Sequence, residues 1–481
     1  MKKQEKNIAF KPNHELARSR TEKVETVYFH FENEKEIKEI GKNKKYFVRT
    51  YGCQANLRDS ETLVGILKDI GYTPAEDIAD ADLVVLNTCA VRENAEKKVF
   101  GEIGLLKDQF KNKPNFILGI CGCMVQQESV VQKIMQKFRH VNFVIGTHNL
   151  YDLPYVIDET IKTKQQVVRV YSKVGEIIED LPTERSSKIK AWVNITYGCD
   201  KFCTYCIVPY ARGKMRSRNK EDILKEVSEL KNQGYKEVTL LGQNVNSYGT
   251  DLQNNYYFAD LLEDVCKLGI PRVRFVTSNP WNFDLKIIDL YKKYDNLMPY
   301  FHLPIQSGNE NVLKKMNRAM KIEDYLKLIK YIKTNLKNYS ISTDLIVGFP
   351  NETKEEFEDT LKLYKEVEYD NAYTFIFSKR TGTAAASFLD EISQEEKKQR
   401  LYQLNALVQE YAKKNNEKLV GRTLEVLVEG NSKTNKSVLF GYSREWKVVN
   451  FKGTAKEGDI VKVKISSASR FNLFGVQEEN N

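Results

Sequence analysis

Three cysteines near the middle of the chain, Cys199, Cys203 and Cys206, have the spacing C-x3-C-x2-C. Three thiolates on one loop can hold three irons of a [4Fe–4S] cube and leave the fourth iron without a protein ligand. An open iron of this kind can bind and polarise a substrate. The alternative is a zinc knuckle, but no fourth Cys or His follows nearby. The spacing therefore predicts a cluster with one open iron.

Three further cysteines, Cys53, Cys89 and Cys123, are widely separated, and their spacing alone assigns no site. Each of them, however, follows an apolar segment that we expect to be a strand of one parallel sheet. Because the C-terminal ends of parallel strands open at one edge, the three thiols should meet there and hold a second cluster. Three inert core cysteines are the alternative. We expect Cys121 either in the core or as a rival ligand, and Cys266 as a packing cysteine on a helix.

A run of cations directly follows the C-x3-C-x2-C loop. Such a run usually marks a solvated surface, but beside an active-site mouth it would bind phosphates and position a nucleotide. We therefore predict phosphate contacts from this run. Its members are Arg212, Lys214, Arg216, Arg218 and Lys220.

The composition is that of a soluble globular protein. Hydrophobic residues make up 41% and charged residues 29% of the 481 residues. No segment has the roughly 20 apolar residues of a membrane helix, and residues 1–6 carry no secretory signal. We therefore expect a cytoplasmic protein, whose eight cysteines stay reduced and serve metal binding or catalysis. The net charge of +10 suits a nucleic-acid partner without identifying one.

The first set of cysteines requires a parallel sheet to bring its members together. Residues 1–44 mix charged and polar residues without a period and are predicted to be a flexible extension. A domain over residues 45–163 follows, in which apolar strands alternate with helices, as in a doubly wound α/β sheet. A polar segment at 177–187 is predicted to be a linker. The predicted strands of the domain are 46–50, 83–86 and 116–120.

A second α/β domain is predicted over residues 185–415. Its six strand–helix units indicate a partial (βα)6 barrel, whose catalytic loops should leave the C-terminal ends of the strands. A charged helix over 393–418 should close it. Residues 418–481 have short strands separated by Gly, Asn and Lys, which is typical of a small antiparallel β-barrel. The predicted strands of the two units are 192–195, 237–241, 273–276, 301–305, 342–347, 373–377, 424–428, 437–440, 446–449, 460–465 and 474–476.

From about residue 45 to its end, the chain resembles the methylthiotransferase family of radical S-adenosylmethionine (SAM) enzymes. These enzymes join a three-cysteine N-terminal domain, a radical SAM domain and a C-terminal TRAM domain. The extension lies outside the resemblance, Cys121 is not one of the family's ligands, and the aromatic Phe202 and Tyr205 fit the radical loop. The segments that carry the resemblance are Thr50–Asn56, Asn87–Glu93, Gly122–Met124, Gly198–Gly213, Gly242–Gly249 and Leu303–Gly308.

The resemblance implies two [4Fe–4S] clusters and two SAM molecules per turnover. One SAM would methylate a sulfur held at an auxiliary cluster, and the second would yield a 5′-deoxyadenosyl radical. The auxiliary cluster would be held by Cys53, Cys89 and Cys123, and the radical SAM cluster by Cys199, Cys203 and Cys206.

The substrate implied by the resemblance is a tRNA anticodon stem-loop with isopentenylated adenosine at position 37, and the product is its 2-methylthio form. Residues 243–248 favour this branch, since siblings with other targets tend to differ there. The resemblance also implies an electron donor such as a flavodoxin-type reductant, and we expect a monomer that does not bind membranes.

SAM contacts are expected at the C-terminal ends of three barrel strands. The loop after the second strand would bind the methionine amino group, although an ordinary βα turn is the alternative. Residues of the fourth and fifth strands should face the barrel interior, and the loop after the fifth should border the adenine. We expect His302, Phe375 and Phe377 to be core residues. The expected SAM contacts are Gly242, Gln243, Asn244, Gln306, Asp344, Gly348 and Phe349.

The C-terminal barrel, which resembles a TRAM domain, should bind RNA by charge and stacking through Arg444, Trp446, Lys447 and Arg470.

Two other functions of the whole chain remain open. One is a sibling enzyme that modifies a ribosomal-protein aspartate or threonylcarbamoyl adenosine. The other is an RNA-binding iron–sulfur protein without turnover, and the open iron predicted for the C-x3-C-x2-C loop argues against it.

Overall fold

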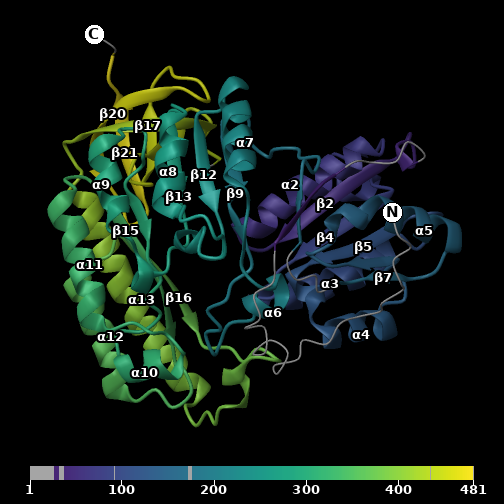
Figure 1. Ribbon diagram of the computed structural model, residues 1–481, viewed down its shortest axis with the longest axis horizontal. Helices are drawn as coiled ribbons and strands as arrows, with labels where there is room; N and C mark the ends of the chain where they lie inside the picture. The colour runs from purple at the N-terminus through teal and green to yellow at the C-terminus, as the bar shows by residue number, and fades with distance from the viewer. Residues whose placement is uncertain (1–25, 32–36, 92, 172–175, 434, 480–481) are drawn as a thin grey trace.

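The computed structural model describes residues 26–31, 37–91, 93–171, 176–433 and 435–479. Three units are visible in Figure 1: an N-terminal α/β domain on the right, a partial barrel on the left, and a small β-barrel, in yellow, above the partial barrel. In the described part of the chain, no helix combines the length and apolar character that a membrane span requires.

The N-terminal domain is built on a six-stranded parallel sheet in the order β3-β2-β4-β5-β6-β7. Its central strands β4 and β5 are buried along their whole length, which explains why they read as continuous apolar runs. Helices α2 and α5 bury an apolar cluster on one face, and α3 and α4 bury another on the opposite face. The elements are β2 (Lys45–Tyr51), α2 (Gln54–Asp69), β3 (Thr73–Pro74), η2 (Ile78–Asp80), β4 (Leu83–Thr88), α3 (Glu93–Gln109), β5 (Ile117–Gly122), η3 (Cys123–Gln126), α4 (Glu128–Lys137), β6 (Phe143–Ile145), η4 (Leu150–Asp152), α5 (Leu153–Thr163) and β7 (Val167–Arg169).

The three strands predicted for this domain are confirmed as β2, β4 and β5. Strands β3, β6 and β7 were not predicted, because two or three residues are too few to show the alternating hydrophobic pattern of a strand. With β7, the sheet continues to Arg169, beyond the predicted domain end at residue 163.

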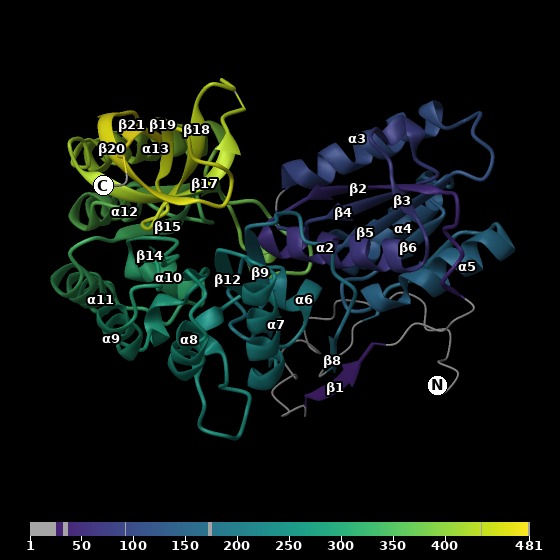
Figure 2. The same ribbon diagram turned by 90° about the horizontal axis from the view of Figure 1, so that it is seen from above.

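A two-stranded parallel ribbon, β1 (Val27–His30) with β8 (Glu176–Glu179), lies below the junction of the two large units in Figure 2. It corrects two predictions, since β1 falls in the predicted flexible extension and β8 overlaps the predicted linker. The Tyr28 hydroxyl donates to the Ser217 carbonyl at 2.8 Å, which ties the ribbon to the partial barrel. Residues 1–25 of the predicted extension lie outside the described residues.

The partial barrel consists of two three-stranded parallel sheets, β13-β12-β9 and β14-β15-β16. A hydrogen bond from Ser278 N to His302 O (3.3 Å) links them. Its helices pack outside the strands around one large apolar core, and α13 closes the unit as predicted. The elements are β9 (Lys190–Asn194), β10 (Thr196–Tyr197), α6 (Val208–Arg212), β11 (Arg216–Ser217), α7 (Lys220–Asn232), β12 (Glu237–Leu241), η5 (Val245–Ser247), α8 (Phe258–Lys267), β13 (Arg272–Phe275), η6 (Pro280–Asn282), α9 (Lys286–Lys293), β14 (Tyr300–His302), α10 (Glu310–Lys315), α11 (Ile322–Asn335), β15 (Ser340–Val347), α12 (Lys354–Val367), β16 (Asn371–Ile376), η7 (Ala384–Ser387) and α13 (Gln394–Glu417).

The C-terminal unit is a closed barrel in the order β17-β18-β19-β21-β20. Its pairings are antiparallel as predicted, except that β19 and β21 run parallel. The strand pattern predicted where strands occur, but it carried no information on which strand closes the barrel. The strands are β17 (Thr423–Asn431), β18 (Leu439–Ser443), β19 (Val448–Lys452), β20 (Ile460–Ala468) and β21 (Asn472–Gln477).

This small barrel closes the N-terminal end of the partial barrel. Arg272, the first residue of β13, donates to the Tyr442 carbonyl at 2.9 Å and to the Glu425 carboxylate at 2.9 Å. Lys190, the first residue of β9, pairs with Glu429. The loops expected to carry chemistry therefore lie at the opposite end of the strands.

Candidate active site

The N-terminal sheet brings Cys53, Cys89 and Cys123 to one edge. Cys53 precedes α2, Cys89 directly follows β4, and Cys123 opens η3 after β5. The thiols of Cys53 and Cys89 are hydrogen-bonded to each other, and Cys123 lies within electrostatic range of both. Gly122 has φ +101°, and a Cβ there would lie 2.3 Å from the Thr88 carbonyl oxygen, so a glycine is needed where β5 turns into the Cys123 loop. We call these three cysteines the auxiliary triad.

A buried polar network fixes the strand ends beneath the auxiliary triad. The Asn56 amide donates to Asn87 Oδ1 (3.2 Å) and to the Thr88 carbonyl (3.1 Å). In return, Asn87 donates to the Asn56 carbonyl and to Ser60 Oγ, both at 2.8 Å. The loops after β2 and β4 are therefore cross-linked by side chains, which explains the two asparagines beside Cys53 and Cys89 in the sequence.

The environment of the auxiliary triad shifts the pKa values of its three thiols in different directions. The hydrogen bond from Cys89 lowers the pKa of Cys53 to about 5, with help from the nearby Arg212 guanidinium. The same bond raises the pKa of Cys89. Burial raises the pKa of Cys123, while Arg212 opposes that rise.

Cys121 packs inside the N-terminal domain rather than with the auxiliary triad. It belongs to the apolar cluster between the sheet and helices α2 and α5. Cys123 instead contacts Ala90 together with Ile207 and Ala211 of the partial barrel. The structure thus favours the core position for Cys121 over a role as rival ligand. Cys266 is likewise buried, in α8.

The second set, which we call the radical-loop triad, consists of Cys199, Cys203 and Cys206 and follows β10. The loop is held at both ends, since Cys199 N donates to the Gly213 carbonyl and Thr204 N to the Met316 carbonyl, at 3.1 and 3.0 Å. Burial and the neighbouring Cys203 raise the pKa of Cys199 to about 11 and raise the pKa of Cys206 further.

Arg318 supports the radical-loop triad and was not expected from the sequence. Its guanidinium lies 3.7 Å from Cys203 Sγ and 3.3 Å from the Tyr205 hydroxyl, and it donates to the Pro304 carbonyl. It also stacks over the Trp281 ring, 4.6 Å from the centroid. No motif marks Arg318 in the sequence, because the turn after α10 brings it to the loop from a distance.

Each triad supplies the three thiolates that a [4Fe–4S] cube with one open iron would need. Zinc prefers four ligands around one point, but no three His, Cys, Asp or Glu side chains in the described ranges could hold a single metal ion. A cube places each of three thiolates on a different iron, so the sulfurs need not converge on one point. Each triad offers the soft thiolate donors that iron–sulfur clusters require.

The short helix α6 joins the two triads. Cys206 lies two residues before the helix and Arg212 is its last residue, and the five helical residues span about 7.5 Å. The Arg212 Nε donates to Cys123 Sγ at 3.2 Å, so the end of α6 reaches the auxiliary triad. The two triads therefore face the same junction between the domains.

The loop after β12, predicted to bind the methionine group, passes close to β10. A Cβ at Gly242 would lie 2.2 Å from Thr196 Oγ1, so only glycine allows this approach. Gln243 is half-buried. The buried Asn244 side chain donates to Ser247 Oγ and accepts from Asn279 N (3.1 Å), so it fixes the loop.

The remaining predicted SAM contacts lie around β15. Gln306 has φ +78° and is backbone-bonded to Asp344 (2.9 Å), whose carboxylate lies 3.5 Å from His302. The Gly348 amide donates to Glu352 Oε2 at 2.7 Å. Phe349 is fully buried against Tyr205 and Phe377, so it supports the loop from behind and its ring is not open to an adenine.

Two core predictions in the neighbouring strands have opposite outcomes. Phe377, which lies just after the end of β16, is buried as expected, whereas Phe375 within β16 is 41% exposed on the same side as the exposed Tyr373.

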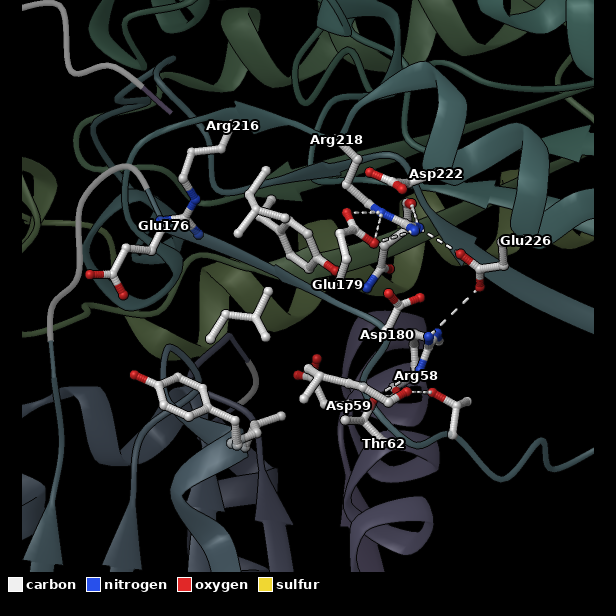
Figure 3. Close-up of a pocket in the computed structure, with 18 of the residues that line it drawn as sticks. Arg58, Asp59, Thr62, Glu176, Glu179, Asp180, Arg216, Arg218, Asp222 and Glu226 are labelled. Carbon is white, nitrogen blue, oxygen red and sulfur yellow. Dashed lines mark hydrogen bonds and ion pairs between the residues drawn. The ribbon is translucent and has the colours of Figure 1, made fainter. Parts of the chain in front are cut away.

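Three members of the cation run, Arg212, Arg216 and Arg218, are enclosed at the domain junction, which corrects the prediction of phosphate contacts for them, whereas the Lys220 side chain is 43% exposed. A cavity of about 320 Å³ lies there, between the N-terminal domain, the ribbon and the partial barrel. Figure 3 shows Arg218 paired with Glu179 and Glu226, at 2.6 Å each. Arg212 binds Cys123, as described above, and Arg216 is also buried. Lys214 is half-buried, with its carbonyl against Gly198.

The predicted RNA contacts of the small barrel mostly face the partial barrel, a second correction. The Trp446 ring lies under the buried Arg274 guanidinium, 4.7 Å from it, and beside Tyr300. Lys447 pairs with Asp370 at 2.6 Å, and Arg444 donates to the Asp295 carbonyl. Arg470 is exposed and bonded to Gln409 of α13 at 2.6 Å. A strand pattern alone could not show which barrel face is covered.

Three known families match the chain, with limits that agree with the structural units. Residues 45–146 match the family described as Uncharacterized protein family UPF0004. Residues 193–364 match the Radical SAM superfamily, and residues 417–476 match the TRAM domain.

Similar proteins span almost the whole chain. The tRNA-2-methylthio-N(6)-dimethylallyladenosine synthase of Malacoplasma penetrans (strain HF-2) is 56% identical over 98% of this chain and 97% of that protein. The protein of the same name from Bacillus subtilis (strain 168) is 50% identical over 96% and 92%. Among solved structures, the radical S-adenosylmethionine methyltransferase TsrM from Kitasatospora setae has a TM-score of 0.52 at 13% identity, over 71% of this chain and 74% of that one, which shows a similar fold.

Proposed function

The chain belongs to the family of tRNA-2-methylthio-N(6)-dimethylallyladenosine synthases (MiaB), and we propose that it methylthiolates C2 of N6-isopentenyladenosine at position 37 of tRNA. One SAM would be the methyl donor and a second the source of the 5′-deoxyadenosyl radical. The observation that carries this proposal is the link between the two cysteine triads through α6, which follows Cys206 and whose side packs against Cys123. A nucleotide bound at this junction would reach both.

The protein's own residues bind and shield the reacting groups. When bound, two [4Fe–4S] clusters would supply an electron for SAM cleavage and a sulfur atom for the product. The auxiliary triad and the radical-loop triad would hold them. Tyr205 of the radical loop packs against the cluster that contains Phe349, and this contact excludes water from that side of the loop.

We place SAM along the C-terminal ends of β12 and β15. Gly242 packs tightly against the Thr196 side chain, and the main chain of this loop would bind the methionine part. The Asp344 carboxylate, with a side chain 27% exposed, faces the barrel interior and would accept hydrogen bonds from the ribose. Gln306 and Gly348 flank this position, while Phe349 stays behind the loop.

The tRNA contact we favour is the outer face of the small barrel, since its opposite face closes the partial barrel. On β20 and β21, Lys464 is exposed and Phe474 is 40% exposed. The turn between these strands adds the exposed Arg470 and Phe471. Aromatic rings beside cations bind single-stranded RNA by stacking and phosphate contact.

This RNA surface is testable by binding alone. The double variant Phe471→Ala, Phe474→Ala should weaken binding of an isopentenylated anticodon stem-loop about tenfold or more, since each stacked base contributes roughly 1–3 kcal/mol. Fluorescence anisotropy at fixed salt would measure it. Trp446→Phe, on the covered face, is the matched control. Equal affinity of the double variant and the parent would exclude this surface.

Three further properties belong to this proposal. A flavodoxin-type reductant would deliver the electrons, the enzyme would act as a monomer, and its site of action would be the cytoplasm, where tRNA is modified. Sedimentation of the loaded protein would settle the oligomeric state.

Nucleoside mass spectrometry tests the reaction directly. We expect tRNA from a deletion strain to lose 2-methylthio-N6-isopentenyladenosine and accumulate N6-isopentenyladenosine. If the methylthio group persists there and a threonylcarbamoyl adenosine or a ribosomal aspartate loses it instead, the sibling function is correct.

A further inference from the structure

Arg212 ends α6 of the partial barrel and reaches into the auxiliary triad of the other domain. Its Nε donates to Cys123 Sγ at 3.2 Å, and a terminal nitrogen lies 2.6 Å from Asp59 Oδ2. The Arg212 and Asp59 side chains are each only 10% exposed. One guanidinium from the partial barrel thus bridges a cysteine and a carboxylate of the N-terminal domain.

The backbone that carries Arg212 is itself held by the N-terminal domain. The Ala211 carbonyl accepts from Thr147 Oγ1 at 3.1 Å and lies 3.1 Å from His148 Nε2. At Gly213, which has φ +73°, a Cβ would lie 2.9 Å from the His148 ring. The position of the guanidinium relative to Cys123 is therefore fixed from both sides.

We propose that Arg212 is a positioning residue of the auxiliary cluster, supplied by the partial barrel, so that the auxiliary site is complete only when the two domains are docked. This inference rests on the proposed function, because it requires a cluster on the auxiliary triad. Arg212 orients the Cys123 sulfur through a charge-assisted hydrogen bond. Hydrogen bonds to cluster sulfurs and local charge set the reduction potential, and a nearby cation favours the reduced state.

A purely structural role for Arg212 makes a different prediction. If the guanidinium only joined the domains through Asp59, its replacement would lower stability without moving the potential of the cluster. The potential is therefore the readout that separates positioning from packing.

The experiment uses the full chain with Cys199, Cys203 and Cys206 replaced by alanine, so that only the auxiliary cluster can be loaded. Anaerobic redox titration followed by EPR gives its midpoint potential. We expect Arg212→Gln to shift the potential to more negative values, and Arg212→Lys to lie between the parent and Arg212→Gln. Asp59→Asn, which leaves the guanidinium but removes its anchor, should broaden the EPR signal of the reduced cluster.

The matched control is Arg218→Gln, a buried arginine that lines the same cavity and pairs with Glu179 and Glu226. Its potential should equal that of the parent. If Arg212→Gln fails to bind iron, restoration by Arg212→Lys supports the proposal, and loss in both variants contradicts it.

Two other outcomes overturn the proposal in distinguishable ways. An unchanged potential in Arg212→Gln, with normal iron content, excludes the positioning role and leaves the proposed function intact. A parent protein that binds no iron at the auxiliary triad overturns the proposed function and this inference together.

Discussion

The two cysteine triads, each proposed to hold an iron–sulfur cluster, are assembled in different ways. The radical-loop triad lies on one short loop, and Arg318, which contacts Cys203, comes from the same barrel. The auxiliary triad is assembled from the ends of β2, β4 and β5, and its arginine, Arg212, comes from the other domain. A site on one loop can form locally, whereas the dispersed site depends on a folded sheet and on docked domains.

The strongest test of this contrast is Cys203→Ala, which removes one ligand of the radical-loop triad. Because a cube with an open iron needs all three thiolates, SAM cleavage should fall below detection. Chromatography of 5′-deoxyadenosine after anaerobic reduction measures it. Continued formation of 5′-deoxyadenosine at the parent rate would refute the assignment of the loop.

Cys89→Ala removes one member of the auxiliary triad and tests the other half of the comparison. It should spare 5′-deoxyadenosine formation, stop methylthio transfer to tRNA, and reduce bound iron by about half, since one of two cubes is lost. Iron analysis and nucleoside mass spectrometry report the two effects separately. A variant that still makes the methylthio product would show that the auxiliary triad is not required.

The next largest effect is expected at the junction between the N-terminal domain and the partial barrel, because the auxiliary triad depends on this junction. Arg218→Ala leaves the buried Glu179 without its partner and removes one of the arginines around Glu226, and it should cost about 3–5 kcal/mol of unfolding free energy. Urea titration followed by circular dichroism measures this loss. The exposed pair Lys225–Asp180 is the matched control, and Lys225→Ala should cost about 1 kcal/mol or less.

The same junction predicts a pH dependence. Burial alone would raise the pKa of Glu226, but Arg218, Arg58 and Arg185 outweigh it and lower the pKa from 4.5 to about 2. Because the folded pKa lies below the unfolded one, the stabilisation is complete above pH 4.5 and is lost as the pH falls towards 2. The stability difference between the parent and Glu226→Gln should therefore shrink over this range. A difference that stays constant down to pH 2 would contradict the assignment.

The smallest expected effect separates Cys121 from its neighbour Cys123. Cys121→Ala should retain the full iron content and lose only about 1 kcal/mol of stability, since it removes one sulfur atom from a packed core. Iron analysis beside Cys123→Ala, which should lose about half the iron, makes the comparison direct. Equal losses in both variants would make Cys121 a ligand.

The sequence indicated the radical-loop triad more directly than the auxiliary triad, for a physical reason. Spacing identified Cys199, Cys203 and Cys206, because all three lie on one loop. The auxiliary triad needed the rule that parallel strands end at one edge, and the structure brings its three thiols together there. The roles of Arg212, Arg318 and Asp59 depend on docking between elements, which no local pattern records.

The surface predictions were weaker for the same reason. Cations such as Arg218 and aromatic residues such as Trp446 look like RNA contacts in a sequence, but here they lie between folded units. Whether a charged residue faces solvent is decided by the packing of domains. The short strands β6 and β7 were missed because three residues are too few to show a period.

Iron and sulfide analysis of the anaerobically reconstituted full chain tests the central claim most directly. Two cubes predict about eight irons and eight sulfides per chain, and about four of each after Cys53, Cys89 and Cys123 are replaced together by alanine. A parent protein with only four irons, or a triple variant that keeps all eight, would contradict the account.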